Sequence, residues 1–386
     1  MHPELRILFF NYEFPPIGGG GANANAYLFR EFARIPELTV DCITSTMNPR
    51  DEVIPLAPNI TLHRLAVGKR DLHFWTQREV LTWLRRAHFK AGELLARRDY
   101  DLSHAFFGFP SGMASWLRRS KLPYLVSLRG TDVPGFNPRF AAQYVLLRPL
   151  FRRIWKDGRF VVANSAGLRT LARRLTPEMD IPVIPNGIDT EEFSPPEGGE
   201  REEGHLLCVS RLVGRKGVQH LIEAMPRIAA AAPETCLTLV GEGNLDATLR
   251  RRVDELRLNG RVRFRGYVPH EQLPDVYRSA RVFIQPSFFE GMSNTVLEAM
   301  ACGLPVVSTA EGGREELFDG NALKVPYGDP VALARGISGL LQDARAREDM
   351  GVRSRQIAER FSWRAVAAKY LELYERTVRL SPRDFT

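Results

Sequence analysis

No apolar run in this chain of 386 residues approaches the roughly 20 residues that a helix needs to cross a bilayer. The N-terminal apolar run at positions 5–10 is too short for a signal peptide and fits a first buried strand. We therefore expect a cytoplasmic protein, whose membrane contact, if it has one, is peripheral and on the inner face of the cell membrane.

Cysteine is scarce as well. The chain has four cysteines, Cys42, Cys208, Cys236 and Cys302, and none lies in a Cys-x-x-Cys pair. This argues for reduced, mostly buried thiols and against disulfides or a zinc site. The sequence also lacks a nucleic-acid-binding motif and a G-x-G-x-x-G fingerprint, because the third position of its glycine run falls on Asn23. We expect no metal, no cofactor and no nucleic-acid partner.

Charge is unevenly distributed. Residues 1–188 carry 26 Lys and Arg against 16 Asp and Glu, whereas residues 189–386 carry 27 against 29, so the net +8 lies wholly in the first half. The basic clusters there are interleaved with the aromatic residues Phe74, Trp75, Trp83, Phe89 and Trp116. Solvated helix faces explain such a pattern. Contact with an anionic membrane surface or an anionic acceptor is the alternative.

Short apolar runs alternate with longer helical patterns, which predicts parallel α/β sheets. In the first half the predicted strands are 6–10, 39–44, 60–65, 102–105, 124–128, 160–163 and 182–184. After a Pro/Gly/Glu-rich linker at 194–204, the second set is 206–210, 237–240, 262–265, 282–285, 305–308 and 322–324.

The fold class is therefore α/β, with two successive doubly wound, Rossmann-like domains and ligands at the carboxyl ends of the strands, in the crevice between them. We place the boundaries at 1–188 and 189–364. A last helix at about 365–386 shows one apolar stripe, and we expect it to pack back on the first domain. The stripe consists of Trp363, Val366, Ala367, Tyr370, Leu373 and Tyr374.

The stretch from 288 to 305 says most about function. It places Glu290 just before a predicted helix and Glu298 about one turn inside it, and Ser293 and Asn294 are good N-cap residues. The backbone N–H groups at such a helix end favour an anion, most naturally a phosphate. Two carboxylates around a held phosphate suit a nucleotide sugar. An amphipathic helix with two solvated glutamates is the alternative.

Two further loops are of interest, and each follows the first predicted strand of one of the two domains. Arg211 and Lys216 lie five residues apart across a glycine-bearing turn, so both can converge on one diphosphate. In the first half, Gly18, Gly19, Gly20 and Gly21 precede a helix, and such a run lets the backbone approach a ligand closely.

With these segments in order, the chain resembles a retaining glycosyltransferase of GT-B family 4 over essentially its whole length. The matching segments are the glycine run, 184–189 (IPNGID), 210–217, 239–243 (LVGEG), 290–298 and 303–306 (GLPV).

The resemblance implies a role for each matching residue. Arg211 and Lys216 should hold the donor diphosphate, Glu298 the ribose hydroxyls, and Glu290 the transferred sugar. Backbone at Met292, Ser293, Asn294 and Thr295 should help to place that sugar, and backbone at Tyr267 and Val268 should meet the nucleobase. Gly18 to Gly21 should lie near the diphosphate and acceptor.

One departure from the family pattern concerns the base. The family commonly shows His-Gly-Thr-Asp where this chain has Arg129-Gly130-Thr131-Asp132, and an arginine cannot act as a general base. The usual His-x-His is reduced to His104-Ala105-Phe106. Glu13, His104 and Asp132 are the candidates for steering the acceptor hydroxyl, and Arg129 for stabilising diphosphate charge or binding an acidic acceptor. For His104, a hydrogen-bonded histidine capping a strand is the alternative.

We therefore predict a metal-independent, retaining hexosyltransferase that moves a sugar from a nucleotide-diphosphate sugar to a saccharide or lipid-linked saccharide, in bacterial-type polysaccharide biosynthesis. The first domain would bind the acceptor and the second the donor. A catalytically silent sugar-nucleotide-binding subunit, a nucleotide-sugar epimerase or hydrolase of the same fold, and, last, a nicotinamide-dependent oxidoreductase are the alternatives.

Overall fold

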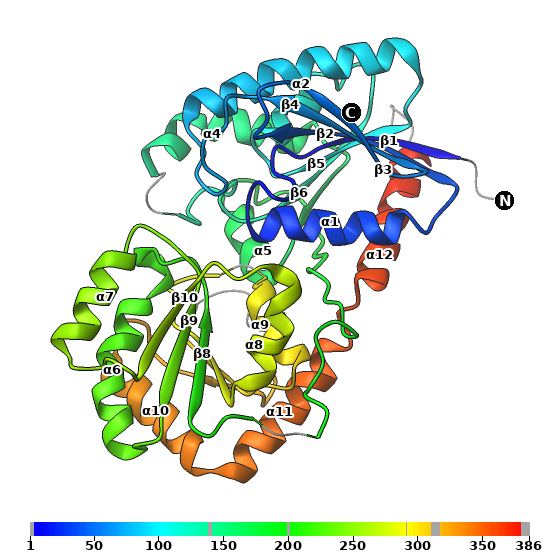
Figure 1. Ribbon diagram of the computed structural model, residues 1–386. Helices are drawn as coiled ribbons and strands as arrows, with labels where there is room; N and C mark the ends of the chain where they lie inside the picture. The colour runs from blue at the N-terminus through cyan, green and yellow to red at the C-terminus, as the bar shows by residue number, and fades with distance from the viewer. Residues whose placement is uncertain (1–3, 138–140, 199–200, 291, 310–316, 380–386) are drawn as a thin grey trace. The chain divides into compact units, whose positions relative to one another are not determined.

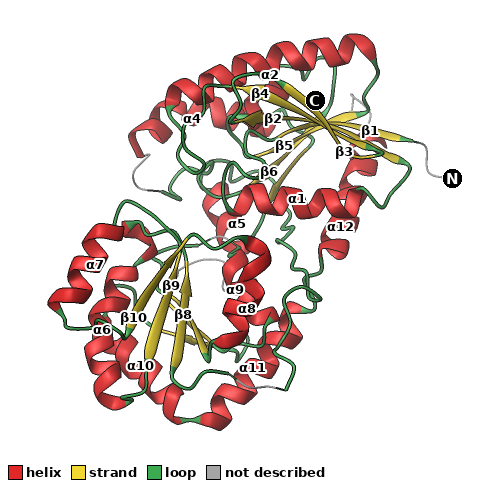
Figure 2. Ribbon diagram, viewed as in Figure 1, coloured by secondary structure: helices red, strands yellow, loops and turns green. Residues whose placement is uncertain are grey.

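The computed structural model describes residues 4–137, 141–198, 201–290, 292–309 and 317–379. The chain divides into two compact units, the first formed by Met1–Gly187 with Trp363–Thr386 and the second by Ile188–Ser362. Each unit is a sheet with helices on both faces (Figures 1 and 2). None of the described helices is long and apolar enough to cross a membrane.

The sheet of the first unit has seven strands in the order β3-β4-β2-β1-β5-β6-β7, and only β3 runs antiparallel to its neighbour. Its six parallel strands follow the doubly wound order, which reverses direction between β1 and β5. The strands are β1 (Leu5–Phe10), β2 (Leu38–Thr46), β3 (Glu52–Ala57), β4 (Ile60–Ala66), β5 (Leu102–Phe106), β6 (Tyr124–Leu128) and β7 (Phe160–Ala163).

The helices of the first unit come from both ends of the chain. They are α1 (Gly20–Phe32), α2 (Gln77–Arg97), α3 (Ser111–Trp116), α4 (Ala141–Lys156), α5 (Ala166–Arg173) and α12 (Trp363–Arg379). The predicted apolar stripe of α12 is buried in the same core as β1 and α1. Residues 380–386 of the predicted last helix lie outside the described residues.

The second unit repeats the doubly wound order in an all-parallel sheet, β10-β9-β8-β11-β12-β13, which reverses direction between β8 and β11. Its strands are β8 (His205–Val209), β9 (Cys236–Val240), β10 (Val262–Gly266), β11 (Val282–Gln285), β12 (Val306–Ser308) and β13 (Ala322–Lys324). Its helices are α6 (Val218–Ala231), α7 (Asp246–Glu255), α8 (Leu273–Ser279), α9 (Asn294–Ala301), α10 (Pro330–Gln342) and α11 (Ala344–Ala358), with the 3₁₀ turns η2 (Gly214–Lys216) and η3 (His270–Gln272).

One predicted strand is absent from the structure, and one observed strand was not predicted. Residues 182–184 form no strand, only an isolated bridge from Val183 to Ala163. β3 was not predicted, because an exposed edge strand carrying Pro55 gives little of the buried signal of its neighbours. The four cysteines are free, and all but Cys236 are buried, which agrees with the prediction of mostly buried thiols.

Candidate functional site

In the second unit, the loops that follow β8 and β11 leave the sheet where its strand order reverses. A doubly wound sheet binds its ligand at this point, because the loops of the two central strands separate there. Both predicted phosphate-binding segments lie in these loops: Arg211 and Lys216 follow β8, and Glu290 follows β11. The structure thus brings together residues that are about eighty positions apart in the sequence.

Close backbone approaches fix the loop after β8. A Cβ added to Gly217, which has φ of 68°, would lie 1.8 Å from the carbonyl oxygen of Pro286. A Cβ on Gly241 would lie 2.1 Å from the carbonyl oxygen of Ser210. The Phe288 N–H also donates to the carbonyl of Arg215 at 2.9 Å. Glycine is required at these positions because any side chain would push the loops apart.

The two loops meet in an ion pair between Lys216 Nζ and Glu290 Oε1. Both side chains are largely buried, with 16% and 11% of their surface exposed. Burial lowers the pKa of Lys216, and Arg215 and Arg211 add to this, while Glu290 opposes it. Burial raises the pKa of Glu290, but Lys216 and Arg215 outweigh burial and the net shift is downward. Glu290 is therefore ionised at neutral pH.

A small cavity lies against this ion pair, and its lining includes Ser210, Ser287 and Thr295. Thr295 lies in the first turn of α9, which begins at Asn294 as predicted. Its N-cap residue, Ser293, makes no side-chain capping bond, and its Oγ lies 3.2 Å from Thr295 Oγ1 instead. The amide end of α9 is thus not capped by this hydroxyl. Gly291, part of the 290–298 segment, lies outside the described residues.

Glu298, in α9, is buried and its carboxylate has two neighbours that the sequence did not reveal. Oε2 accepts a 2.7 Å hydrogen bond from the hydroxyl of Tyr277, and Oε1 lies 3.5 Å from Nε2 of His270. Three further predicted donor-side residues are near strand ends. Arg211 is exposed, and Tyr267 and Val268 directly follow β10, with the Tyr267 side chain 62% exposed.

In the first unit, the glycine run lies at the corresponding reversal of strand order, between β1 and β5. Gly20 and Gly21 start α1, whereas Gly18 has φ of 106°, and its N–H donates to the carbonyl of Leu72 at 2.7 Å. A Cβ on Gly18 would lie 2.7 Å from Oε2 of Glu13. A Cβ on Gly21 would lie 2.5 Å from the ring of Phe107. Gly18 and Gly21 therefore pack tightly against their own unit, whereas Gly19 and Gly20 are exposed.

His104 lies inside β5 with no exposed surface. Its Nδ1 lies 2.6 Å from the hydroxyl of Tyr374 in α12, and its Nε2 lies 2.7 Å from Oγ of Ser127. Burial, and secondarily Arg129, lowers the pKa of His104 well below its usual value. A neutral imidazole with both nitrogens engaged presents no atom to a ligand, so this geometry favours the alternative, a hydrogen-bonded core histidine.

Arg129 and Asp132 share the loop after β6. Asp132 is buried, and its carboxylate accepts N–H bonds from Gly108 at 2.6 Å and from Gly130 at 2.7 Å. Burial raises its pKa, and these bonds oppose the increase. The guanidinium of Arg129 donates to the side chain of Asn186 and lies 4.3 Å from the Phe106 ring centroid. Asp132 therefore shapes the loop, and Arg129 is a cation held in place by its neighbours.

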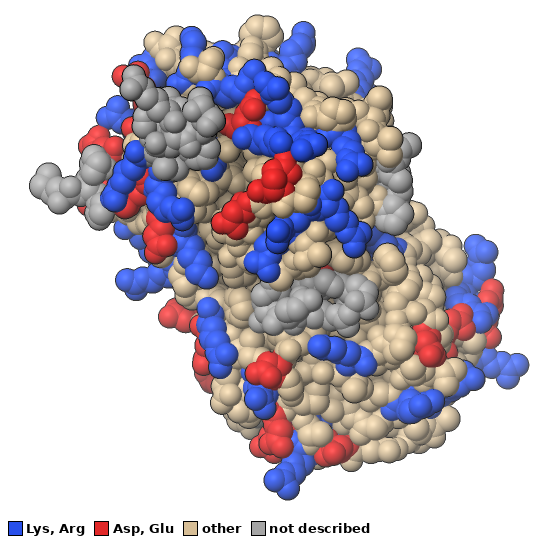
Figure 3. Space-filling model, turned by 180° about the vertical axis from the view of Figure 1, so that it is seen from behind, with Lys and Arg blue, Asp and Glu red and all other residues tan. Residues whose placement is uncertain are grey.

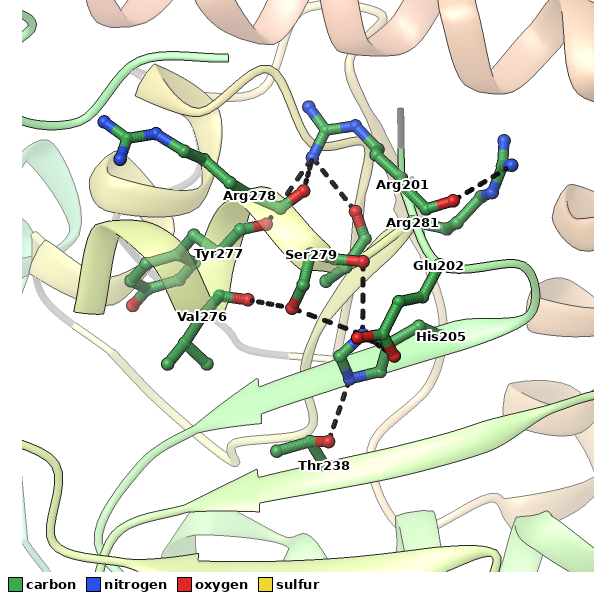
Figure 4. Close-up of polar contacts among 10 residues, drawn as sticks. Arg201, Glu202, His205, Thr238, Val276, Tyr277, Arg278, Ser279 and Arg281 are labelled. Atoms are coloured by element: carbon green, nitrogen blue, oxygen red, sulfur yellow. Dashed lines mark hydrogen bonds and ion pairs between the residues drawn. The ribbon is translucent and has the colours of Figure 1, made fainter. Parts of the chain in front are cut away.

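A polar cluster at the amino end of β8 has the composition of a metal site, because ligand atoms of Glu202, His205 and Cys236 lie within 4.8 Å of one another. Both ring nitrogens of His205 already have partners, however: Nδ1 is 3.2 Å from the Ser279 carbonyl and Nε2 is 2.8 Å from Thr238 Oγ1 (Figure 4). The histidine thus ties β8 to β9 and to the end of α8.

The carboxyl ends of α8 and α9 are held by a neighbouring arginine. Arg201 Nη1 donates to the carbonyl of Arg278 at 3.1 Å (Figure 4) and to that of Ala280 at 3.0 Å. Its Nη2 donates to the carbonyl of Cys302 at 2.6 Å. A cation there satisfies orphan carbonyls and complements the helix dipoles. The opposite end of α9, which carries the amide donors, is held in position as a result.

The protein is thus an α/β protein with two doubly wound units, and in the second unit two loops and the start of α9 meet at the reversal of strand order. Models of two domain families match it: Glycosyltransferase Family 4 over residues 18–192 and Glycosyl transferases group 1 over residues 203–343. Among solved structures, sucrose-phosphate synthase from Thermosynechococcus elongatus superposes with a TM-score of 0.83 at 25% identity, over 96% of this chain and 98% of that one.

Two curated relatives come from Mycolicibacterium smegmatis. The chain is 34% identical over 246 residues to a GDP-mannose-dependent alpha-(1-6)-phosphatidylinositol monomannoside mannosyltransferase, covering 58% of this chain and 64% of the relative. It is 28% identical over 335 residues to a phosphatidyl-myo-inositol mannosyltransferase, covering 84% and 79%. The alignment thus spans less than two thirds of the first relative. The chain belongs to glycosyltransferase family 4 and has the GT-B fold.

Proposed function

We propose that this protein is a retaining, metal-independent glycosyltransferase that moves a hexose from a nucleoside-diphosphate sugar to a saccharide or lipid-linked saccharide acceptor in glycan biosynthesis. One observation carries the proposal. The buried Lys216–Glu290 pair lies at the reversal of strand order of the second unit, next to the start of α9. A cation and helix amides there suit a leaving diphosphate, and a carboxylate suits sugar hydroxyls.

Each predicted donor residue keeps one role in this proposal. Lys216 and Arg211 neutralise the diphosphate, and the backbone of Met292 to Thr295 helps to place the transferred sugar. Glu290 accepts from the sugar hydroxyls, and Glu298 from the ribose. Backbone at Tyr267 and Val268 meets the base. In the first unit, Gly18 to Gly21 and Arg129 contact the acceptor or the donor phosphates.

The retaining step requires cations and N–H donors fixed beside the leaving phosphate more than it requires a general base. In the proposed front-face reaction, the leaving phosphate oxygen takes the proton of the acceptor hydroxyl while the new glycosidic bond forms on the same face of the sugar. The fixed cations and helix amides stabilise the charge that develops on that phosphate. The Asp99-Tyr100-Asp101 triplet has the Asp-x-Asp pattern of a metal-binding motif. It does not suggest a metal at the donor site, because Asp101 lies at the amino end of β5 and its carboxylate accepts a hydrogen bond from the Arg6 N–H.

For the donor we propose GDP-mannose, since the relative that is 34% identical is GDP-mannose-dependent. For the acceptor we propose a lipid-linked saccharide, since both mycobacterial relatives are named for phosphatidylinositol-based acceptors.

Nucleotide binding is the first expected result. A ligand at 100 times its Kd stabilises the folded state by about 2.7 kcal/mol, so GDP should raise the melting temperature by several degrees, and more than UDP or ADP does. A thermal-shift panel of the three nucleotides checks this. If none of them shifts the transition, the proposed function is wrong. With GDP-mannose and an acceptor, NMR of the product should show the α-anomer. Donor binding without product would favour the silent subunit, and full turnover without acceptor would favour the hydrolase.

A peripheral membrane contact belongs to the proposal because the basic excess lies in the first unit. Basic side chains gather over one face of that unit, with a few acidic ones among them (Figure 3). Several are used in ion pairs, such as Arg86 with Asp51. Arg173 and Arg174 are exposed, and within the described residues neither has an ion-pair partner.

One of the aromatic residues proposed for membrane contact is excluded by the structure. Trp83 is wholly buried, whereas Phe89 is 69% exposed.

We expect the protein to float with phosphatidylcholine vesicles that contain phosphatidylglycerol and not with phosphatidylcholine alone, and salt should weaken the effect. Arg173→Glu/Arg174→Glu should reduce flotation several-fold. Arg345→Glu, at an exposed position of α11 in the second unit, serves as the control. Equal flotation with both kinds of vesicle would remove the membrane from the proposal and leave the transferase standing.

A further inference from the structure

Tyr277 contacts a proposed site residue, Glu298, but has no role in the proposed function. Its hydroxyl donates a 2.7 Å hydrogen bond to Oε2 of Glu298. The tyrosine is wholly buried in α8, where its ring lies 5.9 Å from that of Phe193 and 5.8 Å from that of Phe283. The ring therefore has a fixed position, and it acts on the ligand site only through the Glu298 carboxylate.

The hydroxyl of Tyr277 remains a donor under working conditions. Burial, and then the charge and hydrogen bond of Glu298, raises the pKa of Tyr277 well above its usual value. The Tyr277 hydroxyl therefore keeps its proton and donates it to Oε2 of Glu298. One lone pair of Oε2 is thus engaged, and Oε1 is the oxygen that can accept from a ligand without competing with Tyr277.

The neighbour of Oε1 of Glu298 belongs to the same segment of the chain as Tyr277. Nε2 of His270 lies 3.5 Å from Oε1, and Nδ1 of His270 lies 3.5 Å from Oε1 of Glu192. His270 follows Tyr267 and Val268, the proposed base contacts, by only two residues, and Tyr277 follows in the next helix. One segment, 267–277, thus carries the base contacts and both neighbours of the ribose carboxylate.

Holding one oxygen fixes the direction in which the other points. A free glutamate side chain can turn its carboxylate away from a ligand that lacks a hydroxyl, whereas a carboxylate fixed at Oε2 cannot. A deoxyribose would therefore leave Oε1 buried with only the 3.5 Å contact to Nε2 of His270, and a poorly satisfied buried carboxylate costs far more than a weak contact. Discrimination then depends on the fixed orientation as well as on the charge.

We propose that Tyr277 is a positioning residue that makes this site selective for ribonucleotides over deoxyribonucleotides, by holding the Glu298 carboxylate. The inference rests on the proposed function, because it takes Glu298 to be the ribose contact. It adds a residue and a measurable selectivity to that site.

The test compares the Kd of GDP with that of 2′,3′-dideoxy-GDP by titration calorimetry, with the uridine pair used instead if the thermal panel selects UDP. In the unmutated protein, a lost hydrogen bond to a charged group should weaken binding about 10- to 100-fold. In Tyr277→Phe, which keeps the ring, we expect the ratio to fall to about 3-fold or less, mainly through weaker GDP binding.

Tyr124→Phe is the matched control, because it also removes a buried tyrosine hydroxyl, one that donates to the Ile154 carbonyl in the first unit. It should keep the full ratio. A Tyr277→Phe protein that binds GDP with the unchanged ratio, or that loses both ligands equally, overturns the inference alone. Absence of any nucleotide binding in the unmutated protein overturns the proposed function as well.

A second comparison applies if Tyr277→Phe does not fold because Glu298 is left without its donor, since removing both partners of a buried hydrogen bond costs less than removing one. A residue that acts through Glu298 has nothing to position once that side chain is gone. Glu298→Ala and Tyr277→Phe/Glu298→Ala should therefore show the same dideoxy-to-ribo ratio. Ratios that differ more than about 3-fold between these two proteins would show that Tyr277 acts by another route and would overturn the inference.

Discussion

Lys216→Ala is expected to abolish the thermal shift by GDP and to lower kcat by about 100- to 1,000-fold, the loss typical of removing one fixed charge-stabilising group. The reason is that Lys216 is a buried cation at the reversal of strand order, and burial leaves few waters to replace it. Thermal-shift titrations and steady-state kinetics with GDP-mannose check the prediction.

The control for this variant is Lys90→Ala, which removes a lysine paired with Glu93 on the surface of α2. It should leave nucleotide binding and turnover unchanged. Lys216→Ala also leaves Glu290 without its cation, so the melting temperature without ligand has to be recorded alongside. A folded Lys216→Ala protein with unchanged GDP affinity would contradict the assignment of the diphosphate site.

Glu290→Gln is expected to separate binding from turnover. The carboxylate is proposed to contact the transferred sugar, so kcat should fall by about 100-fold or more. GDP affinity should be kept or increased, because Lys216 no longer has a carboxylate partner competing with the diphosphate. Calorimetry with GDP and kinetics with GDP-mannose measure the two effects separately.

Glu223→Gln is the matched control, since Glu223 is a carboxylate paired with Arg252 on the helices α6 and α7. It should alter neither quantity. If Glu290→Gln loses GDP binding and turnover in the same proportion, then Glu290 supports the diphosphate site and does not contact the sugar.

Most strands of the two sheets were predictable because each is marked by an apolar run within its own few residues. β6, β7, β11 and β13 begin and end where the apolar runs predict, and the remaining predicted strands of the sheets differ by one or two residues at their ends. The start of α9 was visible from Ser293 and Asn294. β3 was not predicted because Val53 and Leu56 are exposed and Pro55 lies between them, so the segment lacks the pattern of a buried strand.

The site was predictable as far as its residues lie in short segments. The Lys216–Glu290 pair follows from two loops on neighbouring central strands, so their meeting was a reasonable hypothesis from the sheet order alone. Tyr277 gave no such signal, because in the sequence it is one apolar position of a short helix, and its meaning appears only where α8 packs on α9. The bond between His104 and Tyr374 joins residues 270 positions apart, which no local pattern could indicate.

The last helix of the chain completes the core of the first unit, so that unit is assembled from two separate stretches of polypeptide. A gene cut after codon 187 would therefore encode a sheet stripped of the hydroxyls that satisfy His104 and Ser127, and its product should aggregate. Dissection has to splice residues 363–379 back on, by circular permutation or a short peptide bridge, whereas 188–362 is one continuous fragment that can be expressed by itself.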